Sequence, residues 1–77
     1  MALLLVVKGN KRSAGREAAR RGISAKCRAK VNRGEIVCVV PCHAAAKVHR
    51  WFEQGGVSKK GRGYPPGTLL WFNRKSC

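Results

Sequence analysis

Acidic residues are nearly absent from this chain, which has no Asp and only three Glu among its 77 residues. These are Glu17, Glu35 and Glu53, and they lie on separate predicted elements. A catalytic pair of carboxylates is therefore not expected, and we predict that the protein is not an enzyme. Against the three acids stand 17 Lys and Arg, which give a formal net charge of +14. A surface with this charge attracts polyanions.

Long apolar runs are also missing. The longest covers residues 2–7, far fewer than the roughly 20 residues of a membrane-spanning helix. No basic residue precedes this run and no small-residue cleavage site follows it, although a signal peptide has both. We therefore expect a buried strand here, no membrane contact, and a cytoplasmic location.

Cysteine occurs at only four positions, 27, 38, 42 and 77. This even number allows two disulfides in any of three pairings. Because there is no sign of export, we expect free thiols instead. The spacing of Cys38, Cys42, His43 and His49 is loosely that of a zinc site. On one helix, however, His49 would lie about 10 Å beyond Cys42, so we expect neither a metal nor another cofactor.

The length allows a single domain over residues 1–77, since so short a chain buries only about 60% of the surface of its unfolded form. Residues 1–7 are predicted to form a central strand. Ser13 is then expected to cap a helix that runs to Arg21, with Gly22 in a left-handed conformation at its end. The apolar side of this helix is alanine alone, at positions 14, 18 and 19.

A β-hairpin is expected next. Residues 23–32 alternate between small or apolar and polar side chains, as in a half-buried strand, and residues 35–40 form a β-branched run. A two-residue loop at Arg33-Gly34 would place Cys27 opposite Val40 and turn positions 36, 38 and 40 inward. A three-residue loop would turn Val37 and Val39 inward instead. We favour the first register.

The last third of the chain holds a second helix and a final strand. Pro41 is suited to a helix start, and residues 44, 45, 48, 51 and 52 are apolar at helical spacing until Gly55-Gly56. Residues 57–67 are predicted to be a flexible, basic loop rich in Gly and Pro, and residues 68–73 a strand. The order predicts an α+β fold, the ferredoxin-like split βαβ (βαββαβ), with a four-stranded antiparallel sheet and two helices on one face.

Nucleic acid, RNA or DNA, is the partner that this charge favours. Binding would be led by phosphate contacts and be weakly sequence-specific, because the predicted central strands contain no aromatic residue on which bases could stack. Trp71 or Phe72 on the last strand is the alternative stacking residue, but we expect this neighbouring pair to belong to the core. The candidate nucleic-acid-binding residues are Lys11, Arg12, Arg16 and Arg20 on the first helix, Lys26, Arg28 and Lys30 on the second strand, and Lys59, Lys60, Arg62 and Tyr64 in the basic loop.

The outer face of the sheet suggests an alternative function. One set of alternate side chains on the first strand must point away from the helices, which predicts an apolar patch of the kind that marks interfaces. Its candidate residues are Leu4, Val6, Val37 and Val39. This patch favours a homodimer or a protein partner. The alternative is thus a small inhibitor or regulatory protein, such as a viral accessory factor, that docks on an acidic surface of a larger nucleoprotein machine.

One family resemblance concerns topology. Val7-Lys8-Gly9, Arg16 and Arg21-Gly22-Ile23 resemble the first strand, phosphate loop and first helix of acylphosphatases. The loop of that family has closely spaced glycines and ends in a Phe-Arg pair, whereas this chain has Asn10-Lys11-Arg12-Ser13 there. The resemblance therefore implies a shared topology, which does not by itself imply a shared activity.

Overall fold

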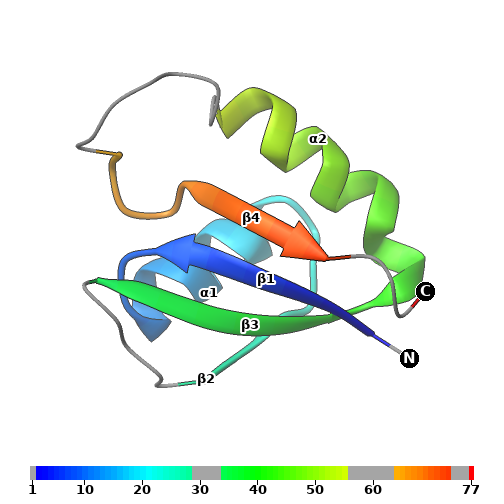
Figure 1. The fold of residues 1–77 in the computed structure, drawn as a ribbon, viewed down its shortest axis with the longest axis horizontal. Coiled ribbons are helices and arrows are strands. Elements are labelled where there is room, and N and C mark those ends of the chain that lie inside the picture. The colour runs from blue at the N-terminus through cyan, green and yellow to red at the C-terminus, as the bar shows by residue number, and fades with distance from the viewer. Residues whose placement is uncertain (1, 29–33, 56–63, 74–76) are drawn as a thin grey trace.

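The computed structural model describes residues 2–28, 34–55, 64–73 and 77. They form a small α+β domain in which two α-helices pack on a four-stranded antiparallel sheet with the strand order β2-β3-β1-β4 (Figure 1). The elements, in chain order, are β1 (Ala2–Lys8), α1 (Lys11–Arg20), β2 (Lys26–Arg28), β3 (Glu35–Pro41), the 3-10 turn η1 (Cys42–Ala44), α2 (Ala45–Gly55) and β4 (Leu69–Asn73). The predicted α+β class is confirmed.

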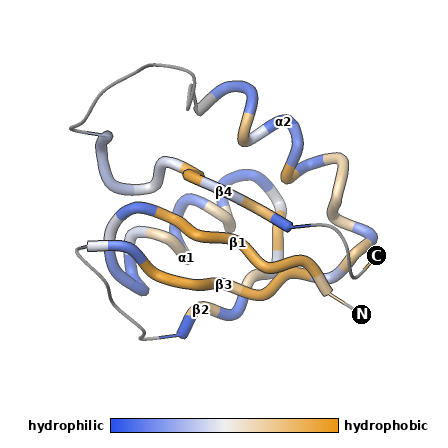
Figure 2. Tube along the Cα trace, in the orientation of Figure 1, coloured by the Kyte–Doolittle hydropathy of each residue, from blue (hydrophilic) through white to orange (hydrophobic). Residues whose placement is uncertain are grey.

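The central strands β1 and β3 build the core by strict alternation. Leu3, Leu5 and Val7 on β1 are buried, and so are their partners on β3, which include Cys38 opposite Leu5. Both strands are consequently the most hydrophobic stretches of the backbone trace (Figure 2). Positions 36, 38 and 40 point inward and Val37 and Val39 do not, so the favoured orientation of this strand is confirmed.

The register of β2 against β3 differs from the prediction. Cys27 lies opposite Cys38 and not opposite Val40. This is a shift of two residues, which leaves every side chain on its predicted face because the side chains of a strand alternate with a period of two. The predicted turn at Arg33 lies outside the described residues.

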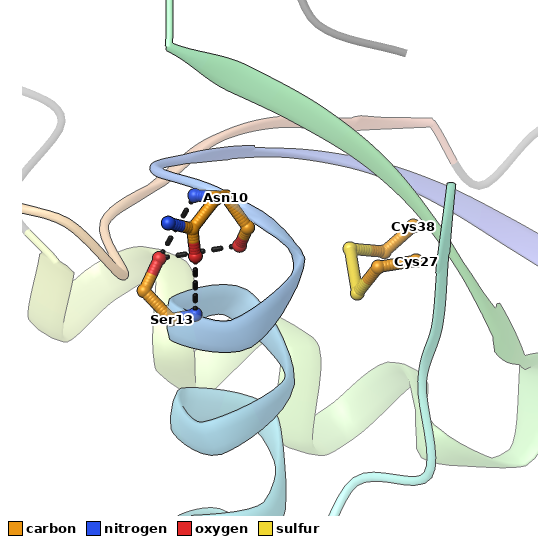
Figure 3. The surroundings of a disulfide bond; sticks show 4 residues. All are labelled: Asn10, Ser13, Cys27 and Cys38. Carbon is orange, nitrogen blue, oxygen red and sulfur yellow. Dashed lines mark hydrogen bonds between the residues drawn. A yellow bond between two sulfur atoms is a disulfide. The ribbon is translucent and has the colours of Figure 1, made fainter. Parts of the chain in front are cut away.

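Helix α1 begins earlier than predicted, because Asn10 and not Ser13 is its N-cap. The backbone N–H of Ser13 donates to Asn10 Oδ1 at 2.9 Å, and the backbone N–H of Asn10 donates to Ser13 Oγ at 3.0 Å (Figure 3). This reciprocal capping satisfies donors that the first turn leaves free. The predicted end is confirmed, since Gly22 has a φ of +72°. Ala14 and Ala18 are buried as expected, whereas Ala19 is exposed.

Helix α2 follows the 3-10 turn that begins after Pro41. Its predicted apolar positions face the core: Val48 and Trp51 are buried and Phe52 packs against them. The Trp51 side chain is only 1% exposed, and its Nε1–H donates to the Gly67 carbonyl oxygen at 3.1 Å. This bond fixes the segment that leads into β4.

Arg21 joins the two helices. Its guanidinium lies 5.3 Å from the centre of the Trp51 ring, and it pairs with Glu17 at 2.9 Å and donates to Gln54 Oε1 at 2.8 Å. One side chain therefore links the end of α1 to the middle and end of α2. Both helices contribute to the same buried cluster as Leu3, Leu5 and Val7.

The expectation of free thiols is wrong, because the four cysteines form two disulfides, Cys27–Cys38 and Cys42–Cys77. The first joins register partners on β2 and β3, on the helix side of the sheet (Figure 3). The second closes one end of the sheet, where Pro41 at the end of β3 and Asn73 at the end of β4 flank β1. The C-terminus accordingly lies beside the start of α2 (Figure 1).

Neither helix within the described ranges has the length and apolar character needed to cross a bilayer.

Candidate nucleic-acid interface

The candidate nucleic-acid-binding cations within the described residues occupy two separate surfaces. The first is the exposed side of α1, and we call its four cations the α1 row: Lys11, Arg12, Arg16 and Arg20. All four are exposed because the opposite side of the helix, with Ala14 and Ala18, is buried against the sheet. The spacing of four residues between the arginines places them along one side of the helix.

The α1 row is largely free of acidic partners. Glu17 contacts Arg20 at 3.5 Å, but its closer contact, at 2.9 Å, is with Arg21. Within the described residues no carboxylate pairs with Lys11, Arg12 or Arg16. These three cations are therefore available to an external anion.

The second basic surface is the edge strand β2. Lys26 and Arg28 are exposed, and Cys27 between them turns toward the helices to meet Cys38. Because strand side chains alternate, Lys26 and Arg28 point to the opposite face of the sheet from α1. The structure thus separates these two predicted groups of cations. Of the other candidates, Lys30, Lys59, Lys60 and Arg62 lie outside the described residues, and Tyr64 is half-buried.

The sheet face turned away from the helices brings together the predicted protein-interface residues and the cations of β2. We call it the open face and define it by two rows across the sheet. One row runs Arg28–Val37–Val6–Trp71 and the other Lys26–Val39–Leu4–Asn73. The Leu4 side chain is 42% exposed, and Val6, Val37 and Val39 are partly exposed. In Figure 1 α1 lies behind β1 and β3, so this face is turned to the viewer.

Trp71 stands exposed at the β4 edge of the open face. We expected both aromatic residues of β4 in the core, but Trp71 is 50% exposed. Phe72 does pack inward, with its ring 5.2 Å from those of His49 and Phe52. The apolar face therefore ends in an indole ring at one edge and in two cations at the other.

Only one of the three acids lies near the open face. Glu35 is the register partner of Lys8, and this pair lies two residues beyond the row that contains Val6 and Val37. Glu17 belongs to the contact between the helices, and Glu53 lies exposed on α2. Cations thus outnumber acids on the open face as well as along the α1 row.

No protein-family model, no curated protein and no solved structure matches this chain. The function is therefore argued from the chemistry of the two surfaces. Exposed guanidinium and ammonium groups bind phosphates, and an exposed indole ring next to apolar side chains binds flat, poorly hydrated groups.

Proposed function

We propose that this protein is a nucleic-acid-binding protein that holds RNA or DNA mainly through phosphate contacts, with weak sequence specificity and no catalytic role. The main support is the α1 row, in which Lys11, Arg12 and Arg16 are exposed and have no carboxylate partner among the described residues. Exposed cations along one side of a helix can contact the phosphates of a nucleic acid without contacting its bases.

The proposal predicts a specific salt dependence. The logarithm of the affinity falls with the logarithm of the salt concentration, with a slope of about −0.9 for each phosphate neutralised on duplex DNA. If all four cations of the α1 row contact phosphates, their part of the slope is about −3.6, so a fourfold rise in salt weakens binding about 150-fold.

Fluorescence anisotropy with short single-stranded and duplex RNA and DNA, from 50 to 300 mM salt, tests this proposal. The informative variant is Arg12→Gln/Arg16→Gln, and Arg50→Gln on the exposed side of α2 is the control for loss of charge elsewhere. We expect the double variant to make the slope shallower by about 1.8 on duplex DNA, about 0.9 for each arginine, and the control to change it less. No binding to any probe at 50 mM salt would refute the proposal.

We further propose that the domain has the ferredoxin-like split βαβ arrangement expected from the sequence. Its support is the element order β1-α1-β2-β3-α2-β4 together with the placement of β1 and β3 as the adjacent central strands. An experimental structure that places another pair of strands at the centre of the sheet would contradict this assignment.

A protein partner is the second candidate, because the open face is apolar at its centre. Leu4 and its neighbours would meet apolar groups of the partner, and Lys26 and Arg28 would meet its acids. This is the inhibitor or regulatory role, as in a viral accessory factor, that docks on an acidic surface. It predicts that open-face substitutions abolish capture of one acidic protein while α1-row substitutions do not.

The cytoplasmic location stays a prediction. Disulfides form and persist in oxidising compartments and are rare in the cytosol, so Cys27–Cys38 and Cys42–Cys77 weigh against it. Labelling free thiols in intact cells before lysis distinguishes the two cases, because a cytosolic chain would be labelled at its cysteines and an oxidised chain would not.

A further inference from the structure

We propose that the open face binds unpaired bases of single-stranded nucleic acid, with the Trp71 ring stacked on a base and Lys26 and Arg28 against phosphates. This inference rests on the proposed nucleic-acid binding and adds to it a preference for single strands and a particular binding face.

A β-bulge in the pairing of β4 with β1 turns Trp71 outward. Leu69 pairs with Val7 and Trp71 with Val6, so β4 advances two residues while β1 advances one, and Leu70 is the additional residue. In a regular strand Leu69 and Trp71 would share a face, and Leu69 is fully buried. The bulge reverses the alternation, which places the indole on the open face. Bulges often redirect a side chain in this way next to functional sites.

The row that ends at Trp71 has a cation at one end and an aromatic ring at the other. It contains Arg28 at the β2 edge, Val37 and Val6 in the middle, and Trp71 at the β4 edge. The two edges are three strand spacings apart in the sheet order, or about 14 Å. A stacked strand rises about 3.4 Å per nucleotide, so this row is as long as about four nucleotides. One short single strand can therefore contact the cations and the indole ring together.

A single nucleic-acid strand fits this face better than a second copy of the chain or a duplex does. A second copy of the chain would bring two molecules of formal charge +14 together across this face, which like-charge repulsion opposes. A duplex hides the flat faces of its bases within its own stack, except at its two ends, so Trp71 cannot stack on bases along its length. A single strand exposes both its base faces and its phosphates, and stacking on an aromatic ring is tolerant of sequence.

The test uses the variants Trp71→Ala and Trp71→Phe with a fluorescein-labelled single-stranded oligothymidylate and with a duplex of equal length. We expect Trp71→Ala to weaken single-strand binding about 5- to 150-fold, the range for one stacked base. Duplex affinity and the salt slope should stay unchanged, because no phosphate contact is lost. Trp71→Phe keeps an aromatic ring and should retain most of the affinity.

Tryptophan fluorescence provides a second measurement. Trp51 is buried and Trp71 is exposed, so oligothymidylate should quench the emission of the natural chain and leave that of Trp71→Phe almost unchanged. Circular dichroism and the melting temperature establish that both variants are folded.

The possible outcomes separate the two proposals. If Arg12→Gln/Arg16→Gln weakens binding but Trp71→Ala does not, the inference is wrong and the proposed function stands. An equal loss on single strands and duplexes also overturns the inference, because base stacking then plays no part. A dimer in sedimentation that Trp71→Ala dissociates would assign the open face to a second copy instead. If no probe binds the natural chain at 50 mM salt, the proposed function itself fails.

Discussion

The two disulfides should differ in what they contribute to stability, and their loop lengths predict the difference. Cys27 and Cys38 are 11 residues apart in the sequence, and Cys42 and Cys77 are 35 apart. In the chain-entropy model, a cross-link stabilises the fold by restricting the unfolded chain, and a longer loop is restricted more. The model gives about 2.8 kcal/mol for the shorter loop and about 3.8 kcal/mol for the longer one.

These values are large for a chain of this size. At about 0.05–0.15 kcal/mol per residue, a domain of this length has a free energy of unfolding of roughly 4–12 kcal/mol. Together the disulfides account for about 6.6 kcal/mol. We therefore expect the fully reduced protein to be marginally stable or unfolded at room temperature, although reduction removes no core side chain.

Two double variants isolate each bond. Cys27→Ala/Cys38→Ala retains only the bond to Cys77, and Cys42→Ala/Cys77→Ala retains only the cross-strand bond. Each variant is unfolded by urea with and without the reductant TCEP. The difference within one variant reports the bond alone, because the effect of the alanines on packing is present in both measurements. We expect a loss larger by about 1 kcal/mol for Cys42–Cys77.

Two results would refute this reasoning. If TCEP changes neither midpoint, the oxidised pairs do not form in solution. If reduction of the cross-strand bond costs more than reduction of the C-terminal bond, loop closure is not the main source of stabilisation, and the contacts of Cys38 within the core are the alternative source.

Three further predictions concern packing and backbone conformation. Trp51→Phe should lower the free energy of unfolding by about 2–4 kcal/mol in urea denaturation, because it leaves the buried Gly67 carbonyl without its donor and opens a cavity. The control is Trp71→Phe, which changes an exposed side chain. An equal loss in both variants would contradict the structural role of Trp51. Gly15→Ala should stabilise the protein by about 0.5–1 kcal/mol, because an added Cβ meets nothing within 4 Å in the middle of α1. Gly9→Ala should destabilise the protein by more than about 1 kcal/mol, because Gly9 has a φ of +114° and the added Cβ would collide with the capping hydroxyl of Ser13. A rise in melting temperature for Gly9→Ala would contradict this prediction and show that the turn tolerates a side chain.

Alternation and helical spacing predicted the elements and most of the core. The inward positions of β3 follow from a period of two, and the burial of Val48 and Trp51 follows from helical spacing. The start of α1 was misplaced, because Asn and Ser are equally good N-caps and both residues take part in the capping box. Propensity alone cannot decide which of two suitable residues three positions apart is the cap.

The disulfides could not be predicted from composition, because their formation depends on register. The expected register placed Cys27 opposite Val40, where no bond is possible. A shift of two residues, which changes no side chain's face, makes Cys27 and Cys38 direct partners. The hydrophobic pattern constrains the face of a strand strongly but is unaffected by shifts of an even number of residues. The second bond depends on where β4 ends, which is a property of the whole sheet.

For the open face, too, the hydrophobic pattern of the sequence predicts only part of the candidate site. On β2 the polar and apolar residues alternate, so the outward orientation of Lys26 and Arg28 could be predicted. On β4 the run from Leu69 to Phe72 is apolar throughout, and such a run fits either face equally well. The pairing with β1 determines which side chains face outward, because Leu70 is the extra residue of a β-bulge and Trp71 then lies beside Val6. The cationic half of the site is thus present in the local pattern of the sequence, whereas its aromatic half arises only when β4 is added to the edge of the sheet.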